Sequence, residues 1–262
     1  MDLRLEGRTA VVTGASRGIG LATVRRLTAE GVRVAAAART APPELTGIPG
    51  STAVPVDLTT AEGPAELISR ATVALGGIDI LVNNLGGVRK GITHDESFTA
   101  IGDAEWQRAL ELNLLSAVRT TRAALPGIVE RRGVIINVSS IGARFAHPPV
   151  EYGAAKAALN NVSKALAEEL GPRGVRVVTV SPGPTRTRNW EAPDSMAADL
   201  AREAGLGLDE FLAALPERMG ITTGRLAEPE ETAALIAFLA SPHAANITGT
   251  DHRVDGGVLK TV

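Results

Sequence analysis

The stretch AVVTGASRGIG, residues 10–20, joins an apolar run to a glycine-rich turn, and helix-forming residues follow directly. Gly14, Gly18 and Gly20 each have a mechanical use, because the turn must be tight, backbone must approach a phosphate, and the helix must pack near the strand. Free N–H groups at the start of that helix favour negative charge. A glycine-rich turn alone is weak evidence, but its place between the first strand and the first helix favours dinucleotide binding over a plain structural turn.

Beyond this turn, short apolar runs alternate with longer helix-like stretches. The runs show little polar alternation, which is typical of parallel strands covered on both faces. The pattern predicts an α/β fold: one domain over residues 1–262, built on a doubly wound (Rossmann) parallel sheet of about seven strands flanked by helices. The expected strands are 9–13, 32–37, 51–56, 78–83, 133–138 and 175–180, with 51–56 the weakest because of Pro55. The expected helices are 18–30, 62–75, 103–129, 152–170 and 230–240.

Composition argues against several classes of protein. The net charge is −2 and Lys and Arg are dispersed along the chain, so neither nucleic acid nor an anionic membrane is an expected partner. The absence of cysteine removes disulfides and thiolate metal sites, and the four histidines lack metal-site spacing, so we expect no metal. No signal-peptide pattern and no apolar run of ~20 residues is present. We therefore expect a soluble, cytoplasmic protein that acts on a small molecule.

Two stretches interrupt the alternation, at residues 88–102 and 184–224. Both follow the carboxyl ends of expected strands, where ligands bind in open α/β sheets. The second contains large apolar side chains in a chain with 3% aromatic residues. It is interpreted either as a substrate lid or as an extra helical pair that packs on the body or on another subunit. The apolar residues are Trp190, Met196, Leu206, Phe211, Leu212 and Met219.

The end of the second strand indicates which dinucleotide is bound. That strand ends in Ala-Ala-Arg39-Thr40, and no acidic residue occurs before Glu44. A carboxylate there would bind a ribose 2′-hydroxyl, whereas arginine accommodates a 2′-phosphate. Arg39 and Arg17 together predict NADP(H) rather than NAD(H). The alternative is two solvated surface arginines.

Tyr152 and Lys156 lie four residues apart, so both fall on one face of an expected helix. Such a pair alone is common, but beside a reactive ring the cation would favour the phenolate and bring the pKa of Tyr152 from ~10 toward a useful range. Tyr152 could then give a proton to an alkoxide or take one from an alcohol. A strand ending in Ser139-Ser140 brings a hydroxyl to the same sheet edge, and Asn113 stands among leucines, where a buried polar residue needs a partner.

These features occur in the order found in short-chain dehydrogenases/reductases, which the chain resembles over nearly its whole length. It is most similar to the branch of 3-oxoacyl carrier-protein reductases and ketone reductases. The resemblance rests on the turn 13–20, Asp57, Asn83-Asn84-Leu85-Gly86, Asn113, Ser139-Ser140, Tyr152 to Lys156, Pro182-Gly183 through Thr187, and Val254-Asp255-Gly256-Gly257.

The resemblance implies an oxidoreductase that moves a hydride between NADP(H) and a carbonyl or alcohol. Tyr152 would be the acid/base, Lys156 would hold the nicotinamide ribose and lower the tyrosine pKa, Ser140 would orient the carbonyl, and Asn113 would support a water-linked proton relay. Asp57 would lie at the adenine, Asn84 and Gly86 near its ribose, and residues 182–187 at the carboxamide. The implied cofactor-binding residues are Gly14, Ser16, Arg17, Gly18, Ile19, Gly20, Arg39, Asp57, Leu58, Asn84, Gly86, Tyr152, Lys156, Pro182, Gly183, Thr185 and Thr187.

Departures from the family pattern leave alternatives open. The gap from Ser140 to Tyr152 is one residue short, so Ser139 is an alternative catalytic hydroxyl; Leu85 replaces an alanine and Ser181 an asparagine. His147 is a candidate substrate contact. The family also implies a homo-oligomer, a tetramer or a dimer. Other hypotheses are a cofactor-binding regulatory protein without turnover, or an epimerase or dehydratase on the same fold, whose relatives carry a longer C-terminal domain. The substrate and the physiological direction are not determined.

Overall fold

One parallel sheet forms the centre of the molecule, with the strand order β3-β2-β1-β4-β5-β6-β7. The computed structural model describes residues 1–89, 97–146 and 149–261. The order reverses between β1 and β4, so a crevice is expected at the carboxyl ends of these strands. The doubly wound sheet is thereby confirmed. The strands are β1 (Thr9–Thr13), β2 (Arg33–Ala38), β3 (Ser51–Pro55), β4 (Ile80–Asn83), β5 (Val134–Val138), β6 (Arg176–Pro182) and β7 (Asp251–Val254).

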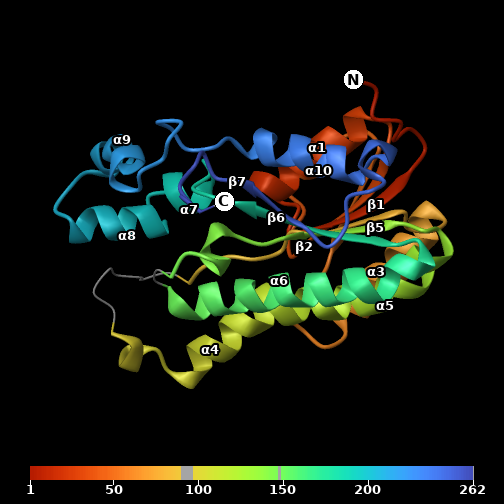
Figure 1. The fold of residues 1–262 in the computed structure, drawn as a ribbon, viewed down its shortest axis with the longest axis horizontal. Coiled ribbons are helices and arrows are strands. Elements are labelled where there is room, and N and C mark those ends of the chain that lie inside the picture. The colour runs from red at the N-terminus through yellow and green to blue at the C-terminus, as the bar shows by residue number, and fades with distance from the viewer. Residues whose placement is uncertain (90–96, 147–148, 262) are drawn as a thin grey trace.

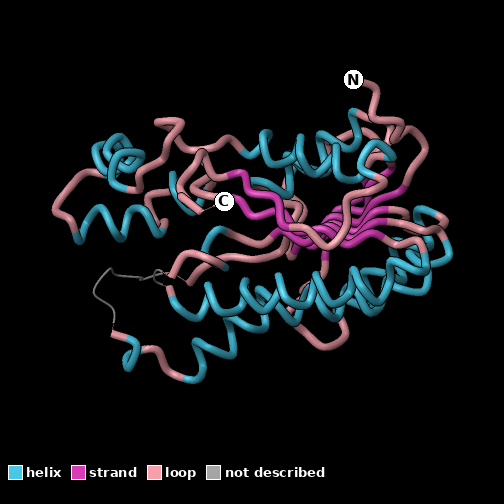
Figure 2. Tube along the Cα trace, in the orientation of Figure 1, coloured by secondary structure: helices cyan, strands magenta, loops and turns pink. Residues whose placement is uncertain are grey.

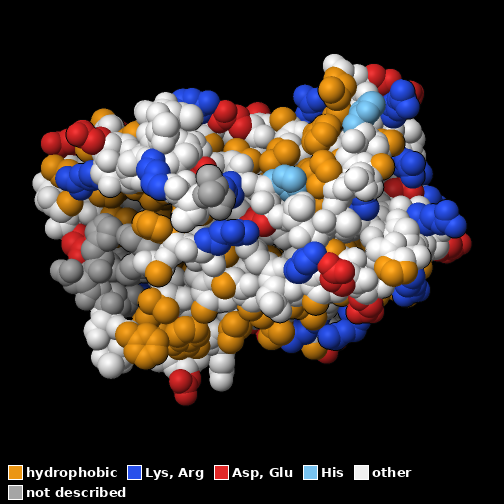
Figure 3. All heavy atoms as spheres, viewed as in Figure 1, with side chains coloured by type: hydrophobic (Ala, Val, Ile, Leu, Met, Phe, Trp, Pro, Cys, Tyr) orange, Lys and Arg blue, Asp and Glu red, His pale blue; other side chains and the backbone are white. Residues whose placement is uncertain are grey.

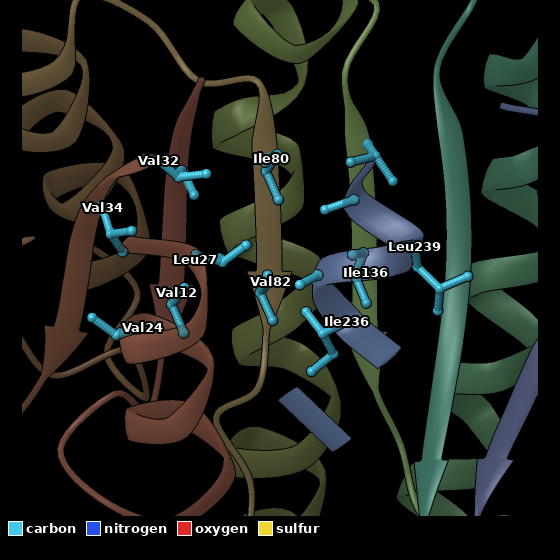
Figure 4. Close-up of a cluster of buried hydrophobic side chains, with 14 of the residues drawn as sticks. Val12, Val24, Leu27, Val32, Val34, Ile80, Val82, Ile136, Ile236 and Leu239 are labelled. Carbon is cyan, nitrogen blue, oxygen red and sulfur yellow. The ribbon is translucent and has the colours of Figure 1, made fainter. Parts of the chain in front are cut away.

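Helices cover both faces of the sheet (Figures 1 and 2). Helices α1 (Gly18–Ala29) and α10 (Pro229–Ala240) lie on one face, and α3 (Gly63–Leu75), α5 (Ser116–Glu130) and α6 (Val150–Leu170) on the other. Consecutive β1 residues face opposite layers: Val12 packs in the first core and Val11 in the second. Figure 4 shows the first core, where valines and isoleucines of the strands meet α1 and α10. Each such side chain contributes about 1.5–3 kcal/mol when fully buried.

The weakest expected strand forms at the edge of the sheet. β3 pairs only with β2, and Pro55 is its last residue, opposite Ala38. A proline that lacks an N–H is tolerated there because the outer side of an edge strand needs no ladder hydrogen bond.

The helix expected over 103–129 is not one continuous α-helix. α4 (Asp103–Leu110) is followed by a π-helical turn over Glu111–Leu115, and α5 begins at Ser116. Asn113 lies in that turn, and its Nδ2 donates to the Ala109 carbonyl at 3.1 Å. Wide turns of this kind occur mostly as single insertions in α-helices, frequently at functional sites.

The segment 184–224 contains three helices beyond the end of the sheet: α7 (Arg188–Glu191), α8 (Met196–Glu203) and α9 (Leu208–Arg218) (Figure 1). They have a small core of their own, in which Leu200, Phe211 and Leu215 pack against Ile141 and Val258 of the body. A helical pair that packs on the body is therefore present. Whether the segment moves as a lid stays a prediction. A further short helix, α2, spans Pro43–Thr46.

The surface shows no single dominant charge on the face drawn in Figure 3, where basic and acidic side chains are intermingled. Across the residues described here, no helix combines the length and the apolarity that crossing a membrane requires.

Candidate active site

A cavity of about 900 Å³ lies at the carboxyl-terminal edge of the sheet. The glycine-rich turn and the ends of β2 and β3 line one part of it, while α4, α6 and α7–α9 line the rest. All the site residues expected from the sequence line this cavity except Asn113. Residues separated by more than a hundred positions along the chain thus meet in one space.

The glycine-rich turn is packed so tightly against its neighbours that a side chain would not fit at Gly14 or Gly20. A β-carbon at Gly20 would overlap the carbonyl oxygen of Gly14 and come within 2.5 Å of Nδ2 of Asn84. That amide donates to the carbonyls of Thr13 and Gly14 at 3.0 and 3.2 Å, so it joins the end of β4 to the turn. No acidic residue lies in the first turn of α1, and Arg17 at its N-cap makes no side-chain cap. The N–H groups there are therefore available to an anion.

Two exposed arginines flank this part of the cavity. Arg17 and Arg39 both line it, and within the described part of the chain no carboxylate lies at ion-pair distance from either. Asp57 faces the same space, but its Oδ1 accepts hydrogen bonds from the backbone and hydroxyl of Thr59 at 2.9 and 2.7 Å. These bonds and, to a smaller extent, the charge of Arg39 lower the pKa of Asp57. The two guanidinium groups can bind a phosphate group without displacing a carboxylate.

Tyr152 lies in the first turn of α6 and faces Ser140. Burial raises the pKa of Tyr152, and a hydrogen bond with the Ser140 side chain opposes that rise in part. The hydroxyl of Ser140 also accepts from the Gly142 backbone at 3.0 Å. Ser139 is buried and donates instead to the carbonyl of Lys156 at 3.3 Å. Of the two serines, Ser140 is the one placed beside Tyr152.

Lys156 is buried, and its Nζ donates to the Val138 carbonyl at 2.9 Å. Nζ lies 5.9 Å from the centre of the Tyr152 ring. Burial lowers the pKa of Lys156 from 10.5 to about 8. The sequence predicted that this cation lowers the pKa of Tyr152, but the pKa is raised. Desolvation of the phenol outweighs the interactions that favour the phenolate.

Asn113 reaches the site indirectly. Its Oδ1 accepts from the backbone N–H of Gly87 at 2.9 Å, and its Nδ2 donates to the Gly87 carbonyl at 3.0 Å. A β-carbon on Gly86 would come within 2.8 Å of Asn113 Oδ1 and 2.9 Å of Lys156 Nζ. The π-helical turn is thus tied to the loop after β4, next to the lysine. The partner role of Gly87 was missed, although the doubled glycine at 86–87 was a signal for it.

Residues of α4 and of the π-helical turn also contribute to the cavity, which was not predicted. Arg108 of α4 and Glu111 and Leu112 of the turn line it, and only their nearness to Asn113 along the chain indicated this. Phe145 lines the cavity as well, whereas His147, the candidate substrate contact, lies outside the described residues. In residues 1–89, 97–146 and 149–261 no group of three or more His, Cys, Asp or Glu could hold a metal.

Replacing Lys156 by methionine is expected to stabilise the ligand-free protein near neutral pH. Because the pKa is about 8 in the folded state and 10.5 in a free side chain, the unfolded chain binds more protons between these values. The free energy of unfolding therefore rises as pH increases from about 8 to 10.5, and below about pH 8 the buried charge of Lys156 lowers it. Thermal unfolding of both proteins across the pH range should show a gain in Tm for Lys156→Met that shrinks as pH rises toward 10.5. A gain that does not depend on pH would contradict this.

Comparison with known proteins places this site in context. A family model described as enoyl-(acyl carrier protein) reductase matches residues 14–259. A 3-oxoacyl-(acyl-carrier-protein) reductase, FabG of Vibrio cholerae, is 36% identical over 263 residues, covering 98% of this chain and 99% of the relative. Two solved structures are similar over nearly their whole length. L-sorbose reductase of Gluconobacter frateurii, solved with NADPH and L-sorbose, has a TM-score of 0.89, 34% identity and 100% coverage of both chains. An NADPH-bound short-chain oxidoreductase of Pseudomonas aeruginosa PAO1, containing an atypical catalytic center, has a TM-score of 0.84, 32% identity and coverage of 97% of this chain and 98% of that one.

Proposed function

The chain belongs to the short-chain dehydrogenase/reductase family, and from that premise we propose that it transfers a hydride between NADP(H) and a carbonyl or alcohol substrate. It is an NADP(H)-dependent oxidoreductase, as its relatives with bound NADPH are. The observation that carries the proposal is that one cavity holds both the glycine-rich turn and the pair Tyr152 and Ser140. A regulatory protein without turnover would not need a half-buried phenol and serine hydrogen-bonded to each other at that position.

The residues present fit the cofactor. The crowded turn at Gly14 and Gly20 and the uncapped start of α1 suit a pyrophosphate, since the backbone comes close and N–H groups are available. Arg17 and Arg39 would hold the 2′-phosphate. The adenine would be held at Asp57 and Leu58, its ribose at Asn84 and Gly86, and the carboxamide by Pro182, Gly183, Thr185 and Thr187, all of which line the cavity.

Proton transfer is assigned to Tyr152. When bound, the nicotinamide gives or takes the hydride at the substrate carbon. Tyr152 donates its proton to the substrate oxygen during reduction, and burial, which raises its pKa, keeps that proton in place at neutral pH. Ser140, hydrogen-bonded to the same phenol, orients the substrate oxygen. The charge that develops on that oxygen is stabilised by these two donors.

Lys156 and Asn113 support the proton transfer by Tyr152. Lys156 lies beside Tyr152, with Nζ 5.9 Å from the centre of the ring, and its lowered pKa makes it able to exchange protons near neutral pH. Asn113 holds the loop at Gly86 and Gly87 next to Lys156, and by its similarity to the family's asparagine it also supports a water-linked proton relay. Neither role requires these residues to contact the substrate.

The proposal also covers the oligomeric state of the protein, its location and the movement of residues 184–224. We expect a homo-oligomer, either a tetramer or a dimer, located in the cytoplasm. We also expect residues 184–224 to close over the substrate, because α8 and α9 line the cavity and connect to the body through a small core.

The proposal is tested by following NADPH oxidation at 340 nm, the ordinary absorbance of the reduced ring, across aldehydes, cyclic ketones, acyl thioesters and quinones. At least one class should be reduced at a rate proportional to enzyme. If NADPH binds and no class is reduced, the regulatory hypothesis replaces this one.

Replacing Arg39 by alanine is expected to weaken NADPH binding by about tenfold or more and leave NADH binding unchanged, because only NADPH carries the phosphate that the guanidinium binds. Fluorescence titration of both cofactors measures this. Arg25→Ala is the matched control, since Arg25 is exposed on α1 and does not line the cavity. A parallel loss of both cofactors, or tighter binding of NADH by the wild type, would contradict the assignment.

A further inference from the structure

One wall of the cavity is apolar. The side chains there are aliphatic, aromatic or thioether groups from α7–α9 and from the loop after β5. A substrate rich in hydroxyl groups would leave many of them without hydrogen bonds against such a wall, at a cost of about 1–3 kcal/mol each. This wall therefore fits a hydrocarbon chain or ring. Its members are Ile141, Phe145, Trp190, Met196, Leu200, Phe211, Leu215 and Met219.

Apart from the charged residues already assigned to the cofactor or to Tyr152, four charged side chains line the cavity, and three of them have an oppositely charged partner. The pairs are Arg188 with Asp194 at 2.8 Å, Arg108 with Glu105 at 3.7 Å, and Glu111 with Arg119. The fourth is Arg218, in the last turn of α9. As far as the described residues extend, no carboxylate lies within ion-pair distance of Arg218. Of these four charged groups, the guanidinium of Arg218 is therefore the one without an oppositely charged partner among the described residues.

Arg218 is an exposed residue whose guanidinium lies over an aromatic ring. Its guanidinium carbon lies 5.6 Å from the centre of the Phe211 ring, and that ring is 2% exposed within the core of α8 and α9. A guanidinium above an aromatic face keeps its N–H edge free. That edge can donate two hydrogen bonds to the two oxygens of a carboxylate. Binding would cost less side-chain entropy, because the ring already restrains the arginine.

We propose that the substrate is a largely apolar carbonyl compound that carries a carboxylate, and that Arg218 binds this carboxylate. The proposal rests on the proposed function, because it takes the reacting carbonyl to lie at Tyr152 and Ser140 while the hydrocarbon lies along the wall. Arg218 is then a specificity-determining residue of the same cavity. An uncharged substrate of the same shape would be reduced, but less efficiently.

Binding measurements on the enzyme saturated with NADP⁺ test this without turnover. Octanoate and octanamide have the same chain and differ in charge, and calorimetric titration compares their affinities. We expect octanoate to bind about tenfold more tightly than octanamide, the effect of one partly exposed charge-assisted hydrogen-bonded pair. Arg218→Gln should remove the preference, and Arg218→Lys should keep part of it. Arg202→Gln is the matched control, because Arg202 is an exposed cation on α8 outside the cavity.

The kinetic counterpart compares an oxo fatty acid with its methyl ester. The acid should have the higher kcat/KM in the wild type, and Arg218→Gln should equalise the kcat/KM values of acid and ester. Equal affinities in the wild type, no binding of octanoate, or a preference that survives in Arg218→Gln would overturn the inference. So would a loss that affects octanoate and octanamide alike, which is what a purely structural role in α9 predicts. Failure of the proposed function looks different, because then neither acid nor ester is reduced by NADPH.

Discussion

Tyr152→Phe is expected to lower kcat by about a thousandfold while NADPH binding stays unchanged. Loss of a positioned proton donor typically costs 10²–10⁴-fold, and the benzyl ring fills nearly the same half-buried space. The phenol is the group that faces Ser140 within the cavity, so the substrate oxygen would lose its proton source while the cofactor part of the site remains intact. Single-turnover NADPH oxidation and fluorescence titration measure the two effects separately.

The two adjacent serines provide the matched comparison for Tyr152. Ser140→Ala should lower kcat strongly, because its hydroxyl is the one bonded to the phenol, whereas Ser139→Ala should retain most activity, because that hydroxyl donates to the Lys156 carbonyl. The opposite ranking would assign Ser139 to the substrate. Wild-type turnover in Tyr152→Phe would remove the tyrosine from the mechanism and, with it, the proposed chemistry.

Gly20→Ala is expected to weaken NADPH binding by about a hundredfold and to lower stability by about 2 kcal/mol. The added β-carbon would overlap the Gly14 carbonyl oxygen and approach Nδ2 of Asn84 at 2.5 Å. The first of these is backbone and the second is fixed by two hydrogen bonds, so the turn itself must move. A shift of the turn displaces the N–H groups at the start of α1 from the phosphate.

Gly127→Ala is the control for Gly20→Ala. Gly127 lies inside α5, and a β-carbon there would meet nothing within 4 Å, so alanine should be neutral or stabilising through its helix propensity. Chemical unfolding gives the stability of each variant, and titration with NADPH gives the affinity. If Gly20→Ala bound NADPH as tightly as Gly127→Ala, the turn would not be the phosphate site.

The positions of the strands were predicted closely because parallel strands carry their apolarity locally. The expected strand 133–138 and β5 differ by one residue, and the expected 78–83 starts two residues before β4. The helix expected from Tyr152 begins at Val150, so Tyr152 lies within its first turn rather than at its start. The helix expected over 103–129 forms, but it contains a π-helical turn at Asn113 that was not predicted, and this turn is associated with hydrogen bonds to Gly87, a residue of another segment. Apolar periodicity along the helix contains no trace of that partner.

The sequence alone determined the parallel sheet, the glycine-rich turn, the absence of an acid after β2, and the placement of Tyr152 and Lys156 on one helical face. Each depends on residues close together in the chain, whose spacing and backbone freedom act locally. Only the tertiary structure decided which serine faces Tyr152, that burial moves the pKa values of Tyr152 and Lys156 in opposite directions, and that Arg218 lies over Phe211 beside an apolar wall. These properties depend on which distant side chains exclude water or supply a partner, and residue order expresses neither until the chain has folded.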